Sequence, residues 1–320
     1  MKLGINAAFA ACRYPEPEIW LKIVGETLGL RYVQFFSDLI DPKVEKKTKE
    51  RLCRNTKNAA KKYKVLIHSL FTGTAPHWSH FLLHPDEGMR KDAVGWWENY
   101  IHMAPFLGAK AVGSFLGSFS VSDSENPKRK KFLTEELVKT WRHFSSLAKD
   151  EGLEYLMFEP MSVPREMPCT ISETEKLYER LNEKMAIPTK LCIDVGHGAS
   201  VSGTGKDRDP YAWIKRFGSR TAVIHLQQTD KKSSRHWPFT KRYNKVGIIR
   251  GEKVLEAIGK SGAREILLVI EVFHSFFEPA EYQVLDDLKE SVDYWRRALR
   301  LFINSEGLND NFKGKSSYRY

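Results

Sequence analysis

The sequence predicts a single α/β domain that folds as a (β/α)8 TIM barrel. Short runs rich in Val, Ile, Leu and Phe recur eight times along the 320 residues, and segments with helical start signals separate them. Such runs are typical of parallel strands that are buried on both faces. The first run continues into GINAAFAA, which is not the glycine-rich phosphate turn of an open doubly wound sheet. A chain of this length fits one barrel, because these domains use roughly 200 to 300 residues as a unit.

The strands follow from the apolar runs in chain order. We expect them at Lys2–Asn6, Tyr32–Ser37, Val65–Leu70, Ala111–Leu116, Tyr155–Glu159, Leu191–Asp194, Thr221–Leu226 and Ile266–Glu271. A helix is expected after each strand, because proline and acidic residues are favoured in a first helical turn. The corresponding signals are Pro15 and Pro17, Asp41-Pro42, Pro85-Asp86-Glu87, Thr134-Glu135-Glu136, Ser172-Glu173, Asp209-Pro210, Gly251-Glu252 and Pro279-Ala280-Glu281. We expect the barrel over residues 1–303 and a polar tail over 304–320.

Three connections are longer than packing requires: Thr72–His84, Gly117–Pro127 and Thr229–Ile249. Barrel enzymes build their sites from the loops at the carboxyl ends of the strands, so these segments are candidate lids and substrate walls. Trp237, in the third connection, is expected to close over a ligand. The alternative for such an aromatic residue is ordinary core packing.

Composition limits the class of partner and the compartment. The net charge of +11 favours anionic partners, which include phosphorylated metabolites and nucleic acid. The 4 cysteines form no CxxC pair and are read as reduced thiols, which indicates a cytoplasmic protein. No uninterrupted apolar stretch approaches the ~20 residues of a membrane span, so no membrane partner is expected.

Four consecutive strands end in a side chain that can bind a metal. YLMFE ends at Glu159, KLCID at Asp194, TAVIH at His225 and LLVIE at Glu271. Any one of them could simply cap a helix or pair with a basic neighbour. Three carboxylates buried together are costly unless a cation neutralises them, so the four residues together predict a divalent metal site. The oxygen-rich set favours Mn²⁺, with Mg²⁺, Co²⁺ or Zn²⁺ as alternatives.

The order Glu, Asp-x-x-His, His, Glu resembles the xylose isomerase-like TIM-barrel superfamily and, within it, the ketose 3-epimerases. Further segments are similar to erythrulose-phosphate 3-epimerases: FEPMSVPRE (158–166), CIDVGHG (192–198), IHLQQTD (224–230) and HWPFT (236–240). The resemblance implies that Glu159 and Glu271 act as the acid/base pair as well as metal ligands, and that His197 binds substrate. It implies C3 epimerisation of D- and L-erythrulose phosphate through a metal-bound enediolate. Relatives of this kind imply a homodimer or homotetramer.

Two positions depart from the epimerases that act on free hexuloses. Arg165 stands where those enzymes have a glutamate, and Lys231 where they have an arginine. Additional cations suit a phosphate, because charge-assisted contacts to its oxygens are strong. We therefore expect Arg165, Lys231, Arg235 and His236 to bind substrate, the alternative being a solvated basic loop. His68 is a further substrate-binding candidate, or a histidine satisfied by its own neighbours.

Three other functions stay open. Return of the proton to a different carbon would give an aldose–ketose isomerase on the same site. A related barrel also serves as a subunit of C-glycoside-cleaving complexes. An endonuclease IV-like repair enzyme would need extra histidines, which the fourth strand, AVGSFLGSF, does not provide. A small sugar or sugar phosphate is therefore the expected partner, and nucleic acid is not.

Overall fold

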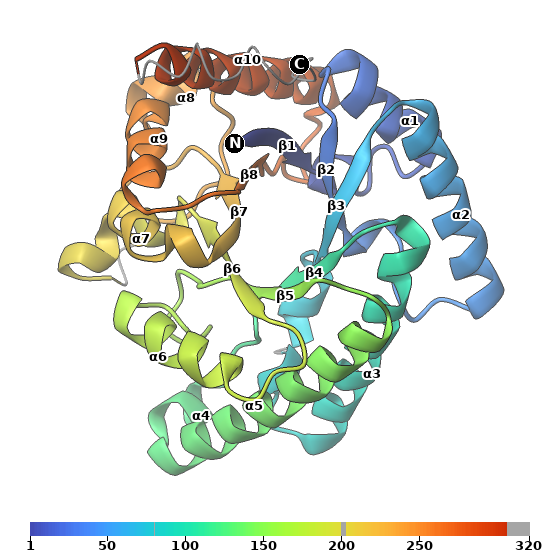
Figure 1. Ribbon diagram of the computed structural model, residues 1–320, viewed down its shortest axis with the longest axis vertical. Coiled ribbons are helices and arrows are strands. Elements are labelled where there is room, and N and C mark those ends of the chain that lie inside the picture. Colours follow the sequence, from blue (N-terminus) through green and yellow to red (C-terminus); the bar gives the residue numbers. More distant parts are fainter. Residues whose placement is uncertain (80, 200–202, 306–320) are drawn as a thin grey trace.

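In the computed structural model, which describes residues 1–79, 81–199 and 203–305, eight parallel strands pair in chain order and close into a barrel (Figure 1). The strands are β1 (Lys2–Asn6), β2 (Tyr32–Phe36), β3 (Leu66–Phe71), β4 (Ala111–Ser114), β5 (Tyr155–Phe158), β6 (Thr189–Asp194), β7 (Thr221–Leu226) and β8 (Leu267–Ile270). β1 pairs with both β2 and β8, which closes the ring. The predicted fold class and the order of its eight strands are thus confirmed.

Helices form an outer ring around the strands (Figure 1). They are α1 (Pro17–Lys22), α2 (Lys46–Lys62), α3 (Glu87–Leu107), α4 (Val121–Glu125), α5 (Pro127–Asp150), α6 (Ile171–Asn182), α7 (Pro210–Phe217), α8 (Lys241–Val246), α9 (Gly251–Lys260) and α10 (Glu281–Ser305). The helix start predicted at Thr134, after the fourth strand, is wrong. α5 begins at Pro127, because the Asn126 side chain accepts hydrogen bonds from the backbone N–H groups of Lys128 and Arg129.

The long connections after β4 and β7 contain short helices of their own. α4 lies within the segment Gly117–Pro127, and α8 lies within Thr229–Ile249. The connection after β3 holds two 3₁₀ turns, Ala75–Ser79 and Phe81–Leu83. These connections follow strand ends, so they stand at the rim where a barrel carries its functional groups.

Apolar side chains form two cores, one between strands and helices and one inside the barrel. In the outer core the rings of Trp97 and Phe144 lie 5.1 Å apart, and those of Trp97 and Trp141 lie 5.2 Å apart, joining α3 to α5. Contacts of this kind are worth about 0.5–1.5 kcal/mol beyond burial of area. The inner core includes Phe71 of β3 and residues from the five strands that follow.

The alternation of side chains along the strands places polar residues directly beyond this inner core, at one end of the barrel. The inner-core residues near the carboxyl ends of β5 to β8 are Met157, Cys192, Val223 and Val269. Two residues further along the chain stand Glu159, Asp194, His225 and Glu271. Because alternate side chains of a strand point to the same face, all four are directed into the barrel mouth.

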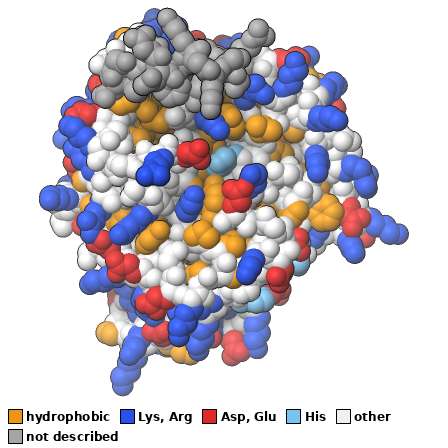
Figure 2. Space-filling view, viewed as in Figure 1, with side chains coloured by type: hydrophobic (Ala, Val, Ile, Leu, Met, Phe, Trp, Pro, Cys, Tyr) orange, Lys and Arg blue, Asp and Glu red, His pale blue; other side chains and the backbone are white. Residues whose placement is uncertain are grey.

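The chain end and the surface complete the description. α10 continues to Ser305, so residues 304 and 305 belong to a helix, and the remainder of the predicted tail, 306–320, lies outside the described residues. None of the helices in the described ranges has the length and apolar character that a bilayer crossing needs. Figure 2 shows one face, on which Lys and Arg side chains are scattered among acidic and apolar ones. On this face they do not form the continuous stripe typical of a nucleic-acid-binding surface.

Candidate active site and metal centre

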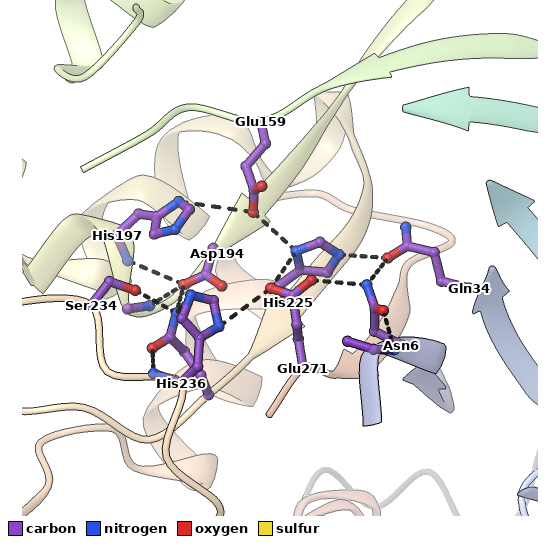
Figure 3. A network of polar contacts seen from close by, with 12 residues as sticks. Asn6, Gln34, Glu159, Asp194, His197, His225, Ser234, His236 and Glu271 are labelled. Carbon is purple, nitrogen blue, oxygen red and sulfur yellow. Dashed lines mark hydrogen bonds and ion pairs between the residues drawn. The ribbon is translucent and has the colours of Figure 1, made fainter. Parts of the chain in front are cut away.

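The four predicted ligands meet at the carboxyl end of the barrel (Figure 3). His225 Nδ1 lies 2.9 Å from Glu159 Oε1 and 3.1 Å from Glu271 Oε2. One ligand atom from each of Glu159, Asp194, His225 and Glu271 lies within 4.8 Å of the others. All four residues are buried. β5, β6, β7 and β8 therefore deliver three carboxylates and one imidazole to a single point.

The charges of this cluster are compatible with a bound cation. Burial disfavours the charged imidazole of His225, yet Cys192, Glu271 and Glu159 together raise its pKa well above the ordinary value. The imidazole thus takes up a proton where a cation would otherwise balance the carboxylates. Asp194 Oδ2 is buried and has no hydrogen-bond partner among the described residues. A free carboxylate oxygen beside two glutamates and an imidazole is the donor set that Mn²⁺, Mg²⁺ or Zn²⁺ accepts.

A second group surrounds Asp194. His197 and His236 approach it from two loops, and one ligand atom of each lies within 4.8 Å of the other two. Burial alone would raise the pKa of Asp194, but the neighbouring imidazoles and the Gln227 amide lower it. His197 Nδ1 donates to the Pro160 carbonyl oxygen at 3.0 Å, which leaves Nε2 of a neutral ring as an acceptor. This bond fixes the orientation of the His197 ring beside Asp194.

Gln227 organises this group, although no sequence motif singles it out. Its Nε2 donates to Asp194 Oδ1 at 2.9 Å and to Ser234 Oγ at 2.7 Å, and its Oε1 accepts from the backbone N–H of Arg235 at 3.1 Å. The side chain is fully buried. It therefore joins the loop after β7 to Asp194 at the end of β6. His236 sits in that loop with a positive φ of 50°, and its Nδ1 is 3.5 Å from Glu271 Oε2.

The remaining predicted cations lie in the loops around the cluster. Arg165 Nη1 donates to the Phe119 carbonyl oxygen at 2.7 Å, tying the loop after β5 to the loop after β4. Arg235 pairs with Asp230 at 3.2 Å, and its guanidinium carbon lies 5.5 Å from the centre of the Trp237 ring. Lys231 is exposed. In the contacts that the structure describes, these residues do not touch the four predicted ligands.

The substrate contacts of Trp237 and His68 stay predictions, and the structure describes only how these two side chains pack. The Trp237 ring stacks on Tyr243 of α8, with centroids 5.0 Å apart. His68 lies towards the amino ends of the strands, where its carbonyl oxygen accepts from Lys110 N at 3.5 Å and its charged neighbours are Lys2, Glu154 and Lys190. Burial, with help from Lys2, lowers the pKa of His68 to about 4. The structure thus does not bring His68 to the ligand cluster at the opposite rim.

Comparison with known protein families places this geometry in context. The sequence matches the family model described as "Xylose isomerase-like TIM barrel" over residues 25–300. It is 32% identical to D-erythrulose 1-phosphate 3-epimerase of Brucella abortus over 296 residues, which cover 92% of this chain and 95% of the relative.

Solved structures show the same fold. A Rhodospirillum rubrum protein, provisionally assigned as a xylose isomerase, superposes with a TM-score of 0.87 at 28% identity, covering 93% of this chain and 99% of its own. D-psicose 3-epimerase of Clostridium cellulolyticum gives a TM-score of 0.70 at 16% identity, with coverage of 93% and 99%. At the latter identity the likeness concerns the fold alone.

Proposed function

This chain belongs to the xylose isomerase-like TIM-barrel family, and from that premise we propose that it is a metal-dependent ketose-phosphate 3-epimerase of the D-/L-erythrulose phosphate class. The general activity, that of a sugar epimerase and hence an isomerase, rests on 32% identity to a named epimerase over nearly the whole length of both proteins. The observation that carries the finer proposal is the convergence of Glu159, Asp194, His225 and Glu271 within 4.8 Å.

We propose these four residues as the ligands of a divalent ion, with Mn²⁺ as the first candidate. When bound, such an ion polarises a substrate carbonyl and stabilises negative charge that develops on its oxygen. Glu271 is oriented for this role because Asn6 Nδ2 donates to its Oε1 at 2.8 Å, which leaves Oε2 directed at the cluster. Asp194 contributes the oxygen that has no partner among the described residues.

Glu159 and Glu271 are proposed as the acid/base pair. Both carboxylates approach the same nitrogen of His225, at 2.9 and 3.1 Å, from β5 and β8. One carboxylate removes the C3 proton, and the electron pair of the broken C–H bond remains in the substrate as an enediolate. The other glutamate, which starts in its acid form, gives a proton to C3 from the opposite face. The result is inversion at C3 with no net change of atoms or charge, and each turnover exchanges the states of the pair.

The loops around the cluster are proposed to bind the remainder of the substrate. His197 offers Nε2 to a hydroxyl, and His236 lies between Asp194 and Glu271. Arg165, Lys231 and Arg235 give the rim a positive potential that suits a terminal phosphate. Arg235 is paired with Asp230, so a phosphate would compete with that carboxylate for the guanidinium group. A cytoplasmic homodimer or homotetramer stays a prediction.

Proton exchange in D₂O tests the proposed reaction. The Mn²⁺-loaded protein is incubated separately with tetrulose, pentulose and hexulose phosphates, and deuterium is located by NMR. Incorporation at C3 alone, fastest with the tetrulose phosphate, is the expected result. Incorporation at C1 would show aldose–ketose isomerisation instead, and no exchange with any ketose phosphate would refute both. Glu159→Gln and Glu271→Gln serve as matched controls that retain side-chain volume.

A further inference from the structure

Two buried amides from β1 and β2 contact the ligand cluster from the side opposite Asp194. His225 Nε2 lies 2.7 Å from Gln34 Oε1, and Asn6 Nδ2 lies 3.1 Å from the same oxygen (Figure 3). Both amide side chains are at most 2% exposed. The first two strands of the chain thus reach ligands that belong to the last two.

The donor and acceptor of each hydrogen bond in this side-chain network follow from one backbone group. The N–H of Ala8 can only donate, and it lies 2.9 Å from Asn6 Oδ1, so that atom is the oxygen and Nδ2 is the donor. Asn6 Nδ2 then donates to Gln34 Oε1, which must be an acceptor. An acceptor at Gln34 Oε1 requires that His225 carry a proton on Nε2. Gln34 Nε2 agrees, because it donates to Ser69 Oγ at 3.3 Å.

The consequence appears on the other side of the His225 ring. A neutral imidazole with its proton on Nε2 presents a lone pair at Nδ1, and Nδ1 is the atom that faces Glu159 Oε1 and Glu271 Oε2. In the opposite tautomer Nδ1 would carry a proton at the centre of the cluster, and a protonated nitrogen cannot bind a cation. The same Asn6 amide also donates to Glu271 Oε1. One network thus leaves His225 Nδ1 and Glu271 Oε2 as the atoms available to a cation.

We propose that Gln34 is a positioning residue, supported by Asn6, which holds His225 in the tautomer that can ligate a cation at Nδ1. This inference rests on the proposed metal dependence. It goes beyond the four ligands, because Gln34 itself cannot contact the ion while its oxygen is bound to the far side of the imidazole ring. Loss of such a partner typically weakens metal binding by about 10- to 100-fold.

Mn²⁺ affinity of the chelator-treated protein tests the proposal without reference to turnover. Free Mn²⁺ is measured by electron paramagnetic resonance during titration of wild type, Gln34→Met, Gln34→Glu and Ser69→Ala. Gln34→Met keeps the length of the side chain but removes the acceptor, and we expect affinity to fall about 10- to 100-fold. Gln34→Glu retains an acceptor oxygen and should bind within about threefold of wild type or more tightly. Ser69→Ala leaves Gln34 Oε1 in place and should also stay within about threefold.

The outcomes separate this proposal from the proposed function. Equal affinity of Gln34→Met and wild type would overturn the role of Gln34 and leave the metal site intact. Failure of wild type to bind Mn²⁺ would overturn the metal dependence and, with it, this inference. If Gln34→Met does not fold, ¹H–¹⁵N NMR of wild type loaded with Zn²⁺ decides. A proton bound to Nε2 of His225 supports the proposal, and a proton bound to Nδ1 overturns it.

Discussion

Replacing His68 by asparagine should remove a large part of the acid sensitivity of folding. Burial lowers the pKa of His68 to about 4, whereas in the unfolded chain the ordinary value of 6.5 applies. Between these values the unfolded state binds more protons than the folded state, so stability falls as the pH is lowered. At roughly 1.4 kcal/mol per pKa unit, the full difference is about 3 kcal/mol, of which about 2 kcal/mol is lost between pH 7.5 and pH 5.

Urea denaturation with excess chelator measures this effect in the metal-free protein. Free energies of unfolding are determined for wild type and His68→Asn at pH 7.5, 6.5 and 5. Other titrating groups contribute equally to both proteins and cancel in the difference. Asparagine lowers stability at pH 7.5 through lost packing, yet the gap to wild type should narrow by about 2 kcal/mol at pH 5. A gap that stays constant with pH would refute the assignment of a partly buried neutral imidazole. An unchanged KM would confirm that His68 is remote from substrate.

Three other predictions concern the site. Glu159→Gln and Glu271→Gln should each lower kcat by about 10²- to 10⁴-fold, the usual contribution of a general acid or base, while circular dichroism shows an intact fold. Activity within tenfold of wild type would exclude the residue as acid or base. Mn²⁺ affinity should fall by up to tenfold per pH unit as the pH is lowered, because the raised pKa of His225 means that a proton must leave before a cation binds. The protonated His225 stabilises the metal-free protein at low pH, and this stabilisation is lost as the pH rises through the raised pKa. A pH-independent affinity measured by calorimetry would contradict the assignment. Arg235→Gln should raise KM for a ketose phosphate several-fold and leave KM for the unphosphorylated ketose unchanged, and an equal effect on both substrates would count against a phosphate contact.

The convergence of the four proposed ligands could be predicted because each stands where an apolar strand ends. Residues such as Met157 and Val269 already show the alternation that directs Glu159 and Glu271 inward, and that alternation is a property of the local sequence. Gln227 follows β7 at the same rim, but a glutamine there carries no chemical signal of its own. Its role depends on the loop that folds back to it over Ser234 and Arg235.

The residues that the sequence did not reveal depend on closure of the barrel. Asn6 and Gln34 lie in unremarkable strand sequences, and only the pairing of β1 with β8 brings Asn6 to Glu271. The position of His68 likewise depends on strand pairing, and its substrate contact stays a prediction. The register of β2 against β3 shifts so that consecutive residues Val33 and Gln34 pair with Ile67 and Ser69, leaving His68 in an irregularity. β3 continues to Phe71, one residue beyond the predicted end at Leu70.

The bond between Asn6 and Glu271 joins side chains 265 positions apart, across the seam where the first strand meets the last. During synthesis on the ribosome, the segment that ends in Glu271 emerges only after most of the polypeptide has been made. The nascent chain therefore cannot assemble the complete set of proposed cation ligands early, and premature capture of an ion by a partial barrel would involve fewer donors. Binding of a metal by all four proposed ligands should consequently require that the whole ring has closed.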